Sequence, residues 1–219
     1  MKNRAVLVDG GIYHVFTFTR SISGFVIFRT DSDYERMRSQ LRYYRMVNPP
    51  MRFSHFLEIK DKESIHQRFS ENKEHLVEIM AYCLMPTHIH LVLKQSKGAS
   101  ISRFMSNVLN SYTRYFNNKN KRRGPLWKGR FKSVMVETDE QLLHLTRYLH
   151  LNPTTSRLIR SPEDWKYSSY REFTEEVKED SLCMNSEYLN MSSGDYREFV
   201  TSRKEYQHEL AKIKHVCLE

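Results

Sequence analysis

Apolar and polar residues follow one another along the 219-residue chain in patterns that predict a succession of strands and helices. Aromatic and β-branched residues alternate with others over 13–20, which is typical of a strand. The polar run from Thr30 to Asp33 is typical of a helix start, and a helix is expected over 34–47, where two consecutive prolines end it. Further elements are expected at 76–84 (strand), 88–94 (strand), 100–117 (helix), 131–136 (strand) and 138–151 (helix), the last ended by Pro153.

This β-α-β-β-α-β-α order indicates the α+β fold class, with a ferredoxin-like antiparallel sheet and helices packed on one face. Residues 48–73 exceed what such a compact fold needs and are interpreted as an insertion, in which Phe53–Ile59 could form a strand and 64–72 a short helix. The chain beyond Trp165 is first rich in Tyr and Ser, then acidic, and a helix is expected over 194–213. We therefore expect a main domain over residues 1–173 and an acidic, helical C-terminal extension over 174–219.

The composition is that of an ordinary soluble globular protein, with 39% hydrophobic and 28% charged residues. No apolar run approaches the length of a membrane span or a signal peptide, so we expect neither a membrane protein nor a secreted one. The three cysteines, Cys83, Cys183 and Cys217, are odd in number and lack metal-type spacing, which indicates reduced thiols. A cytoplasmic location, in a bacterial cytosol or nucleoid, is the expectation.

Charge is distributed unevenly along the chain, and this says more than the net charge of +9. The stretch 94–132 contains eleven Lys or Arg residues and no Asp or Glu, whereas 172–198 contains eight acidic residues and two basic ones. An evenly solvated surface would not separate the signs in this way. The basic stretch therefore predicts a polyanionic partner.

Two histidines lie at period-two spacing in the expected strand 88–94. His88 and His90 share one face of that strand, and the apolar residues between and after them share the other. Such a pair more often packs or faces solvent than binds metal, but two imidazoles from a rigid strand can begin a divalent-metal site. On the expected helix 138–151, Tyr148 and Asn152 lie one turn apart, on the face that His144 also shares.

If that helix lies against the histidine strand, the combination suits phosphodiester cleavage. Asn152 could supply a third metal ligand, and a metal held by two His and one amide keeps positions open for phosphate oxygens. The phenol of Tyr148 could then act as a nucleophile, although most helical tyrosines simply pack. Attack would leave a covalent phosphotyrosine and a free 3′-hydroxyl, and the reverse step would rejoin the DNA.

The loop after helix 100–117 combines basic and aromatic residues, as in surfaces that bind single strands. Its cations can neutralise phosphates, and aromatic rings among them could stack on unpaired bases, although Tyr115 and Phe131 could equally belong to the core. The residues expected to contact DNA are Lys119, Lys121, Arg122, Arg123, Trp127, Lys128, Arg130 and Lys132.

Several linked motifs resemble those of one family. The run from Ala81 to Leu91 (AYCLMPTHIHL) resembles the signature of the single-tyrosine HUH transposases of the insertion-sequence type (IS200-like), closest to the branch of REP-associated tyrosine transposases. The accompanying motifs are Tyr13-His14-Val15, Gly124–Phe131 (GPLWKGRF), Arg147–Pro153 (RYLHLNP) and Trp165–Tyr170 (WKYSSY). Together they cover roughly residues 11–173. Thr87 stands where the family usually has Asn.

The resemblance implies a ferredoxin-like enzyme that cuts and rejoins single-stranded DNA through a 5′-phosphotyrosine, using Mg²⁺ or Mn²⁺. It implies His88, His90 and Asn152 as metal ligands, Tyr148 as the nucleophile, and a single-stranded or hairpin DNA substrate, in transposition or in processing of palindromic repeats. Members of the family act as homodimers or as monomers, and the sequence leaves open whether this chain forms a homodimer. Two alternatives are a catalytically inactive nucleic-acid-binding relative and a hydrolytic, metal-dependent nuclease in which Tyr148 only packs.

Overall fold

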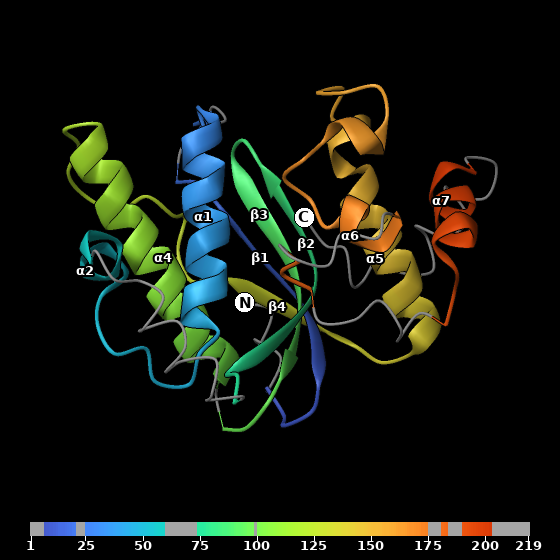
Figure 1. The fold of residues 1–219 in the computed structure, drawn as a ribbon, viewed down its shortest axis with the longest axis horizontal. Coiled ribbons are helices and arrows are strands. Elements are labelled where there is room, and N and C mark those ends of the chain that lie inside the picture. Colours follow the sequence, from blue (N-terminus) through green and yellow to red (C-terminus); the bar gives the residue numbers. More distant parts are fainter. Residues whose placement is uncertain are drawn as a thin grey trace.

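The computed structural model describes residues 7–20, 25–59, 74–98, 100–174, 181–183 and 190–202. Its centre is a four-stranded sheet in the order β2-β3-β1-β4, in which all neighbouring strands are antiparallel (Figure 1). The strands are β1 (Ile12–Phe18), β2 (Val77–Met85), β3 (His88–Gln95) and β4 (Lys132–Val136). This topology confirms the ferredoxin-like α+β prediction.

The first face of the sheet is covered by α1 (Asp31–Tyr44) and α4 (Ser100–Lys119), and α2 (Phe53–Glu58) lies beside them (Figure 1). Alternate strand residues such as Tyr13, Val15 and Leu91 point to this side and are completely buried. They form the larger apolar core with the inward stripe of α4. The α4 stripe has the helical period predicted from the sequence.

The second face is covered by α5 (Asp139–Thr155), with η1 (Pro162–Asp164), α6 (Tyr170–Thr174) and α7 (Ser193–Thr201) outside or beside it (Figure 1). The expectation of helices on one face therefore holds for α1 and α4 but not for α5. The reason is that the other alternate set of strand residues, which includes Cys83 and Val92, is also apolar. An antiparallel sheet with two apolar faces has to be covered on both.

Two local predictions differ from the structure. Residues 53–58 form a helix rather than a strand, and buried Phe53 packs on Tyr43 with the ring centroids 5.1 Å apart. Pro153 does not end α5, which continues to Thr155, because a proline in the last turn removes only one of the helix hydrogen bonds. The helix expected over 64–72 lies outside the described residues, and α7 covers the described part of the one expected over 194–213.

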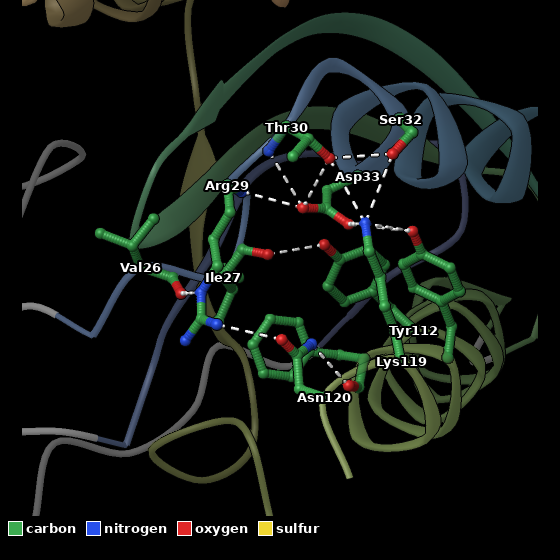
Figure 2. A network of polar contacts seen from close by, with 11 residues as sticks. Val26, Ile27, Arg29, Thr30, Ser32, Asp33, Tyr112, Lys119 and Asn120 are labelled. Carbon is green, nitrogen blue, oxygen red and sulfur yellow. Dashed lines mark hydrogen bonds and ion pairs between the residues drawn. The ribbon is translucent and has the colours of Figure 1, made fainter. Parts of the chain in front are cut away.

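A polar network joins the start of α1 to the end of α4 on the first face (Figure 2). Asp33, which is almost fully buried, accepts hydrogen bonds from the Thr30 backbone N–H at 3.1 Å and the Tyr115 hydroxyl at 2.9 Å, and it pairs with Lys119 at 2.6 Å. Burial opposes ionisation of this carboxyl, but the bonds from Lys119, the Arg29 backbone and Tyr115 hold its pKa below the usual range. The network therefore fixes the helix start that the polar run at 30–33 predicts.

Two smaller findings concern membrane-spanning helices and the state of the cysteines. No helix among the described residues is long and apolar enough to cross a lipid bilayer. Cys83 is a buried free thiol and Cys183 is a partly buried one, whereas Cys217 lies outside the described residues.

Candidate functional site

The predicted histidines lie on the second face of the sheet, beneath α5. Phe16 of β1 pairs with His90 of β3, and Phe18 pairs with His88. Directly paired residues point to the same side of a sheet, so β1 and β3 together present a patch of rings to the tyrosine helix. Contacts of His90 with Tyr148 and Asn152 of α5 confirm the prediction that this helix lies alongside the sheet that bears the histidines.

His90 is completely buried, and polar groups lie on both sides of its ring. Its Nε2 lies 3.2 Å from Nδ2 of Asn152, and its Nδ1 lies 3.0 Å from Nε2 of His14. Asn152 therefore reaches the position that the metal-ligand prediction requires. His14 orients His90 from the side opposite Asn152, in the way that second-shell groups orient metal ligands.

His14 is a site residue that sequence reasoning missed. The motif Tyr13-His14-Val15 by itself indicates only part of a strand. The available signal was the period of two: once β1 and β3 are neighbours, residues 14, 16 and 18 share a face with His88 and His90. The pairing of the two strands, which the sequence does not contain explicitly, is what brings His14 to the site.

His88 lies at the start of β3 and is partly exposed. Its Nδ1 lies 2.9 Å from the Thr87 hydroxyl, so the residue that replaces the family's usual Asn also provides a hydrogen bond. The rings of His88 and His90 are 4.9 Å apart between centroids and nearly perpendicular, at 89°. One ring nitrogen of His88 is thus engaged by Thr87, which fixes the direction of the other.

Tyr148 of α5 lies over His90 and His14. Its ring centroid is 5.8 Å from that of His90 and 6.4 Å from that of His14, with edge-to-face geometry in both cases. The Tyr148 side chain is half-buried. His144, one turn earlier, does not join the site, because its ring lies 5.6 Å from Phe199 of α7.

The donor set fits a divalent cation only if the amide takes part. Among the described residues, no group of three His, Cys, Asp or Glu side chains could hold a metal. His88 and the carboxamide of Asn152 each lie next to His90, and the oxygen and nitrogen ends of a carboxamide are exchanged by a simple flip. Two imidazoles with one amide oxygen form a mixed nitrogen and oxygen donor set of the kind that binds divalent metal ions.

The outer side of α5 is fixed through His150. This ring is completely buried; its Nδ1 lies 2.7 Å from the Tyr196 hydroxyl of α7, and its Nε2 lies 2.8 Å from the Ser169 hydroxyl. Burial lowers the pKa of His150 to about 3, so the imidazole stays neutral in the folded protein. α7 and the segment before α6 thereby hold the helix that carries Tyr148 and Asn152.

The basic loop passes the end of β1 that lies next to His88. The Lys128 backbone N–H donates to the Phe18 carbonyl at 2.9 Å, and that of Arg20 donates to Leu126 at 3.0 Å. Lys132 pairs with Phe16, so it shares the face of the sheet with His90, one strand further away. Five of the predicted DNA contacts are exposed on this side or in the loop leading to it: Lys121, Arg123, Lys128, Arg130 and Lys132.

The other three predicted contacts have structural partners. Lys119 pairs with Asp33, and Arg122 donates to Asn117 at 2.9 Å and to the Pro125 carbonyl at 2.8 Å. Trp127 corrects the prediction of a stacking surface: its ring belongs to the core, only 8% exposed, and Nε1 donates to the Leu109 carbonyl at 3.2 Å. Phe131 is likewise buried. From the sequence, an aromatic residue in a basic loop is equally compatible with packing in the core and with stacking on a base. In the structure Trp127 and Phe131 pack in the core.

Fold and site together define a ferredoxin-like protein in which a helical tyrosine faces a pair of strand histidines. The family model described as "Transposase IS200 like" matches residues 38–152, which is more than half of the chain. The chain therefore belongs to the family of IS200-like transposases, as the sequence motifs predicted.

Individual proteins that resemble this chain include a curated relative and a solved structure. A Haemophilus influenzae protein named "Putative REP-associated tyrosine transposase" is 28% identical over 103 residues, which are 42% of this chain and 58% of that protein's length. A solved structure described as a REP-associated tyrosine transposase bound to a REP hairpin aligns with a TM-score of 0.55 and 15% identity, over 85% of this chain and 95% of that one. The second likeness shows a shared fold.

Proposed function

We propose that this protein cuts and rejoins single-stranded DNA through a covalent bond to Tyr148. The observation that carries the proposal is that Tyr148 and Asn152 both lie next to His90 on one side of the sheet. The centroids of the Tyr148 and His90 rings are 5.8 Å apart, and the His90 Nε2 lies 3.2 Å from the Asn152 amide nitrogen. Family membership supports the same activity. A tyrosine and an asparagine one helical turn apart are common in helices. Their contact with two histidines from neighbouring strands, here His90 and His14, is not a general feature of helix packing.

In this mechanism the Tyr148 oxygen attacks the phosphorus of a DNA phosphodiester. A Tyr–O–P bond forms, the bond from phosphorus to the 3′-oxygen breaks, the phenol gives up its proton, and the leaving 3′-oxygen gains one. His88, His90 and Asn152 would hold Mg²⁺ or Mn²⁺, which, when bound, polarises phosphate oxygens. Because the phosphotyrosine is still a phosphodiester, attack by a 3′-hydroxyl reverses the reaction and joins DNA ends.

His14 and Thr87 act on the site as positioning residues. Each contacts one ring nitrogen of a candidate ligand: His14 contacts the Nδ1 of His90, and Thr87 contacts the Nδ1 of His88. Fixing one nitrogen of an imidazole sets the tautomer and direction of the other. The two ligand nitrogens are therefore oriented before any substrate arrives.

The substrate we propose is single-stranded or hairpin DNA. Lys128 and Lys132 are exposed next to Phe18 and Phe16 of β1, and together with exposed Arg130 they would contact its phosphates. The structural neighbour is described as bound to a REP hairpin, and this supports the choice of substrate. We further propose that residues 1–173 form the catalytic domain and that the extension, through α7, supports the outer side of α5.

The experiment is incubation of the protein with a labelled hairpin oligonucleotide from the flanks of its own gene, with Mn²⁺ or with EDTA, followed by a denaturing gel. We expect a metal-dependent protein–DNA adduct that Tyr148→Phe abolishes while DNA binding stays within about threefold. Tyr115→Phe is the matched control, because that phenol lies on the other face of the sheet, bonded to Asp33. Cutting without an adduct would identify a hydrolytic nuclease, and binding with neither would identify an inactive DNA-binding relative.

A further inference from the structure

The turn that follows the tyrosine helix contains an unusual backbone position. The Arg157 backbone N–H donates to the Thr154 carbonyl at 2.9 Å, and the Leu158 backbone N–H donates to the Pro153 carbonyl at 3.0 Å. These two bonds are the pattern of a Schellman motif, which ends α5. In this motif the residue at the position of Arg157 must have a positive φ, and glycine usually occupies it. Arg157 has φ 58°, so a long side chain is held in a backbone conformation that L-residues disfavour.

A hollow of about 600 Å³ opens at this turn, lined by Thr154, Arg157, Leu158, Ile159 and Arg160. Within the part of the chain that the structure describes, neither arginine forms an ion pair or a side-chain hydrogen bond. The Thr154 hydroxyl oxygen is buried and has no hydrogen-bond partner among those same residues. Leu158 is 45% exposed, which makes it one of the few exposed large apolar side chains in the described ranges.

The hollow lies at the C-terminal end of α5, the helix that carries Tyr148 and Asn152. Ser156, in the same turn, donates its backbone N–H to the Asn152 carbonyl at 2.9 Å. A rise of 1.5 Å per residue places Thr154 roughly 9 Å along the helix from Tyr148. In Figure 1 the orange segment after α5 and the turn between β2 and β3 lie at the same, upper end of the molecule. A strand of DNA held at Tyr148 could therefore continue into the hollow.

We propose that residues 154–160, here called the α5 turn, bind one nucleotide of single-stranded DNA next to the phosphate at Tyr148. Arg157 and Arg160 would neutralise its phosphate, and the base would lie on Leu158 and Ile159. This inference rests on the proposed function, which brings DNA to Tyr148. It adds a contact on the side of the site away from the basic loop.

A structural explanation of Arg157 makes a different prediction. A cation near a helix C-terminus interacts favourably with the helix dipole, but any position in the last turn serves that purpose without a positive φ. Arg157→Gly removes both the side chain and the backbone strain. If Arg157 is retained for DNA, this variant should melt at a temperature equal to or above that of the wild type and yet bind DNA more weakly.

The test measures the dissociation constant of a labelled hairpin oligonucleotide with a single-stranded flank, from 50 to 400 mM NaCl, without divalent metal. Each lost contact with a single strand should lower the slope of log affinity against log salt by about 0.7, so the double variant Arg157→Gly, Arg160→Ala should lose about 1.4 and bind roughly 10–30-fold more weakly near 0.1 M. Arg157→Lys keeps the charge and should bind like the wild type. Arg52→Ala removes an exposed arginine at the start of α2, and this control should also be unchanged.

The outcomes separate this subsite from the proposed function. A wild-type slope in the double variant overturns the subsite, whether or not the wild-type protein forms the covalent adduct. The expected loss of slope together with an absent wild-type adduct supports the subsite and refutes strand transfer. An equal loss on a blunt duplex of the same sequence would overturn the assignment to single-stranded DNA, and no DNA binding by the wild type would overturn both proposals.

Discussion

Lowering the pH from 7.5 to 5.5 should destabilise the fold through one buried side chain, His150. In the native protein the pKa of this imidazole is about 3, lowered from its ordinary value by complete burial. In the unfolded chain it is near 6.5. Acidification therefore protonates His150 in the unfolded state only, and the free energy of unfolding falls. The loss begins near pH 6.5, continues as the pH falls to about 3, and ends there.

The size of the effect follows from the two pKa values. With a native pKa far below the range tested and an unfolded pKa near 6.5, the free energy of unfolding should fall by about 1.4 kcal/mol between pH 7.5 and 5.5 from His150 alone. Other histidines titrate in the same range. The quantity to measure is therefore the difference in pH dependence between the wild type and His150→Gln, which cannot be protonated.

The neighbours of His150 show why it resists protonation. The Ser169 hydroxyl contacts the Tyr82 carbonyl at 3.3 Å, so it can donate there while accepting from His150 Nε2 at 2.8 Å. Nδ1 then accepts from the Tyr196 hydroxyl at 2.7 Å, which matches the preference of a phenol to donate. A neutral imidazole protonated at Nε2 satisfies both bonds. An imidazolium would have to reverse the bond to Tyr196.

The assay is urea unfolding at pH 7.5 and at 5.5, followed by circular dichroism and by fluorescence so that coincident transitions establish two-state behaviour. We expect His150→Gln to be less stable than the wild type at pH 7.5 and to lose about 1.4 kcal/mol less on acidification. Equal pH dependence in the two proteins, within about 0.3 kcal/mol, would refute the inference that the native state excludes a proton from this ring.

Two further predictions concern the site and the basic loop. His14→Ala should weaken Mn²⁺ binding by about 10–100-fold in calorimetric titration, because it removes the group that orients His90; unchanged affinity would show that His90 needs no such support. Trp127→Phe should lower the free energy of unfolding by about 1–2 kcal/mol through lost packing and the lost bond to Leu109, without changing DNA affinity. A drop in DNA affinity with unchanged stability would restore Trp127 as a stacking residue.

Much of the fold could be predicted because local signals and tertiary packing agree. The central strands are runs of mostly apolar residues, and Thr30 and Thr138 begin the helices that their positions predict, with the Thr138 hydroxyl accepting from the Gln141 backbone at 3.1 Å. The location of α5 could not be read from its own pattern. It depends on the second apolar face of the sheet, which emerges only when the four strands are placed side by side.

The candidate site could be predicted where its geometry is local. Tyr148 and Asn152 are one helical turn apart, and His88 and His90 are two residues apart in a strand, so spacing alone aligns each pair. His14 required strand pairing, since 76 residues separate it from His90. Burial decided the role of Trp127, because composition does not distinguish a ring that stacks on a base from one that packs in the core.

The site is assembled within one chain, and this has a genetic consequence. The Tyr148 ring lies against His90 of the same polypeptide, on a helix pinned from behind by Tyr196 and Ser169. If the active assembly keeps this arrangement, a chain lacking the tyrosine and a chain lacking the histidine cannot repair one another. Co-expression of the Tyr148→Phe and His90→Ala variants would then give no strand-transfer activity. If two copies instead exchanged their tyrosine helices, each mixed dimer would contain one site with both the tyrosine and the histidine.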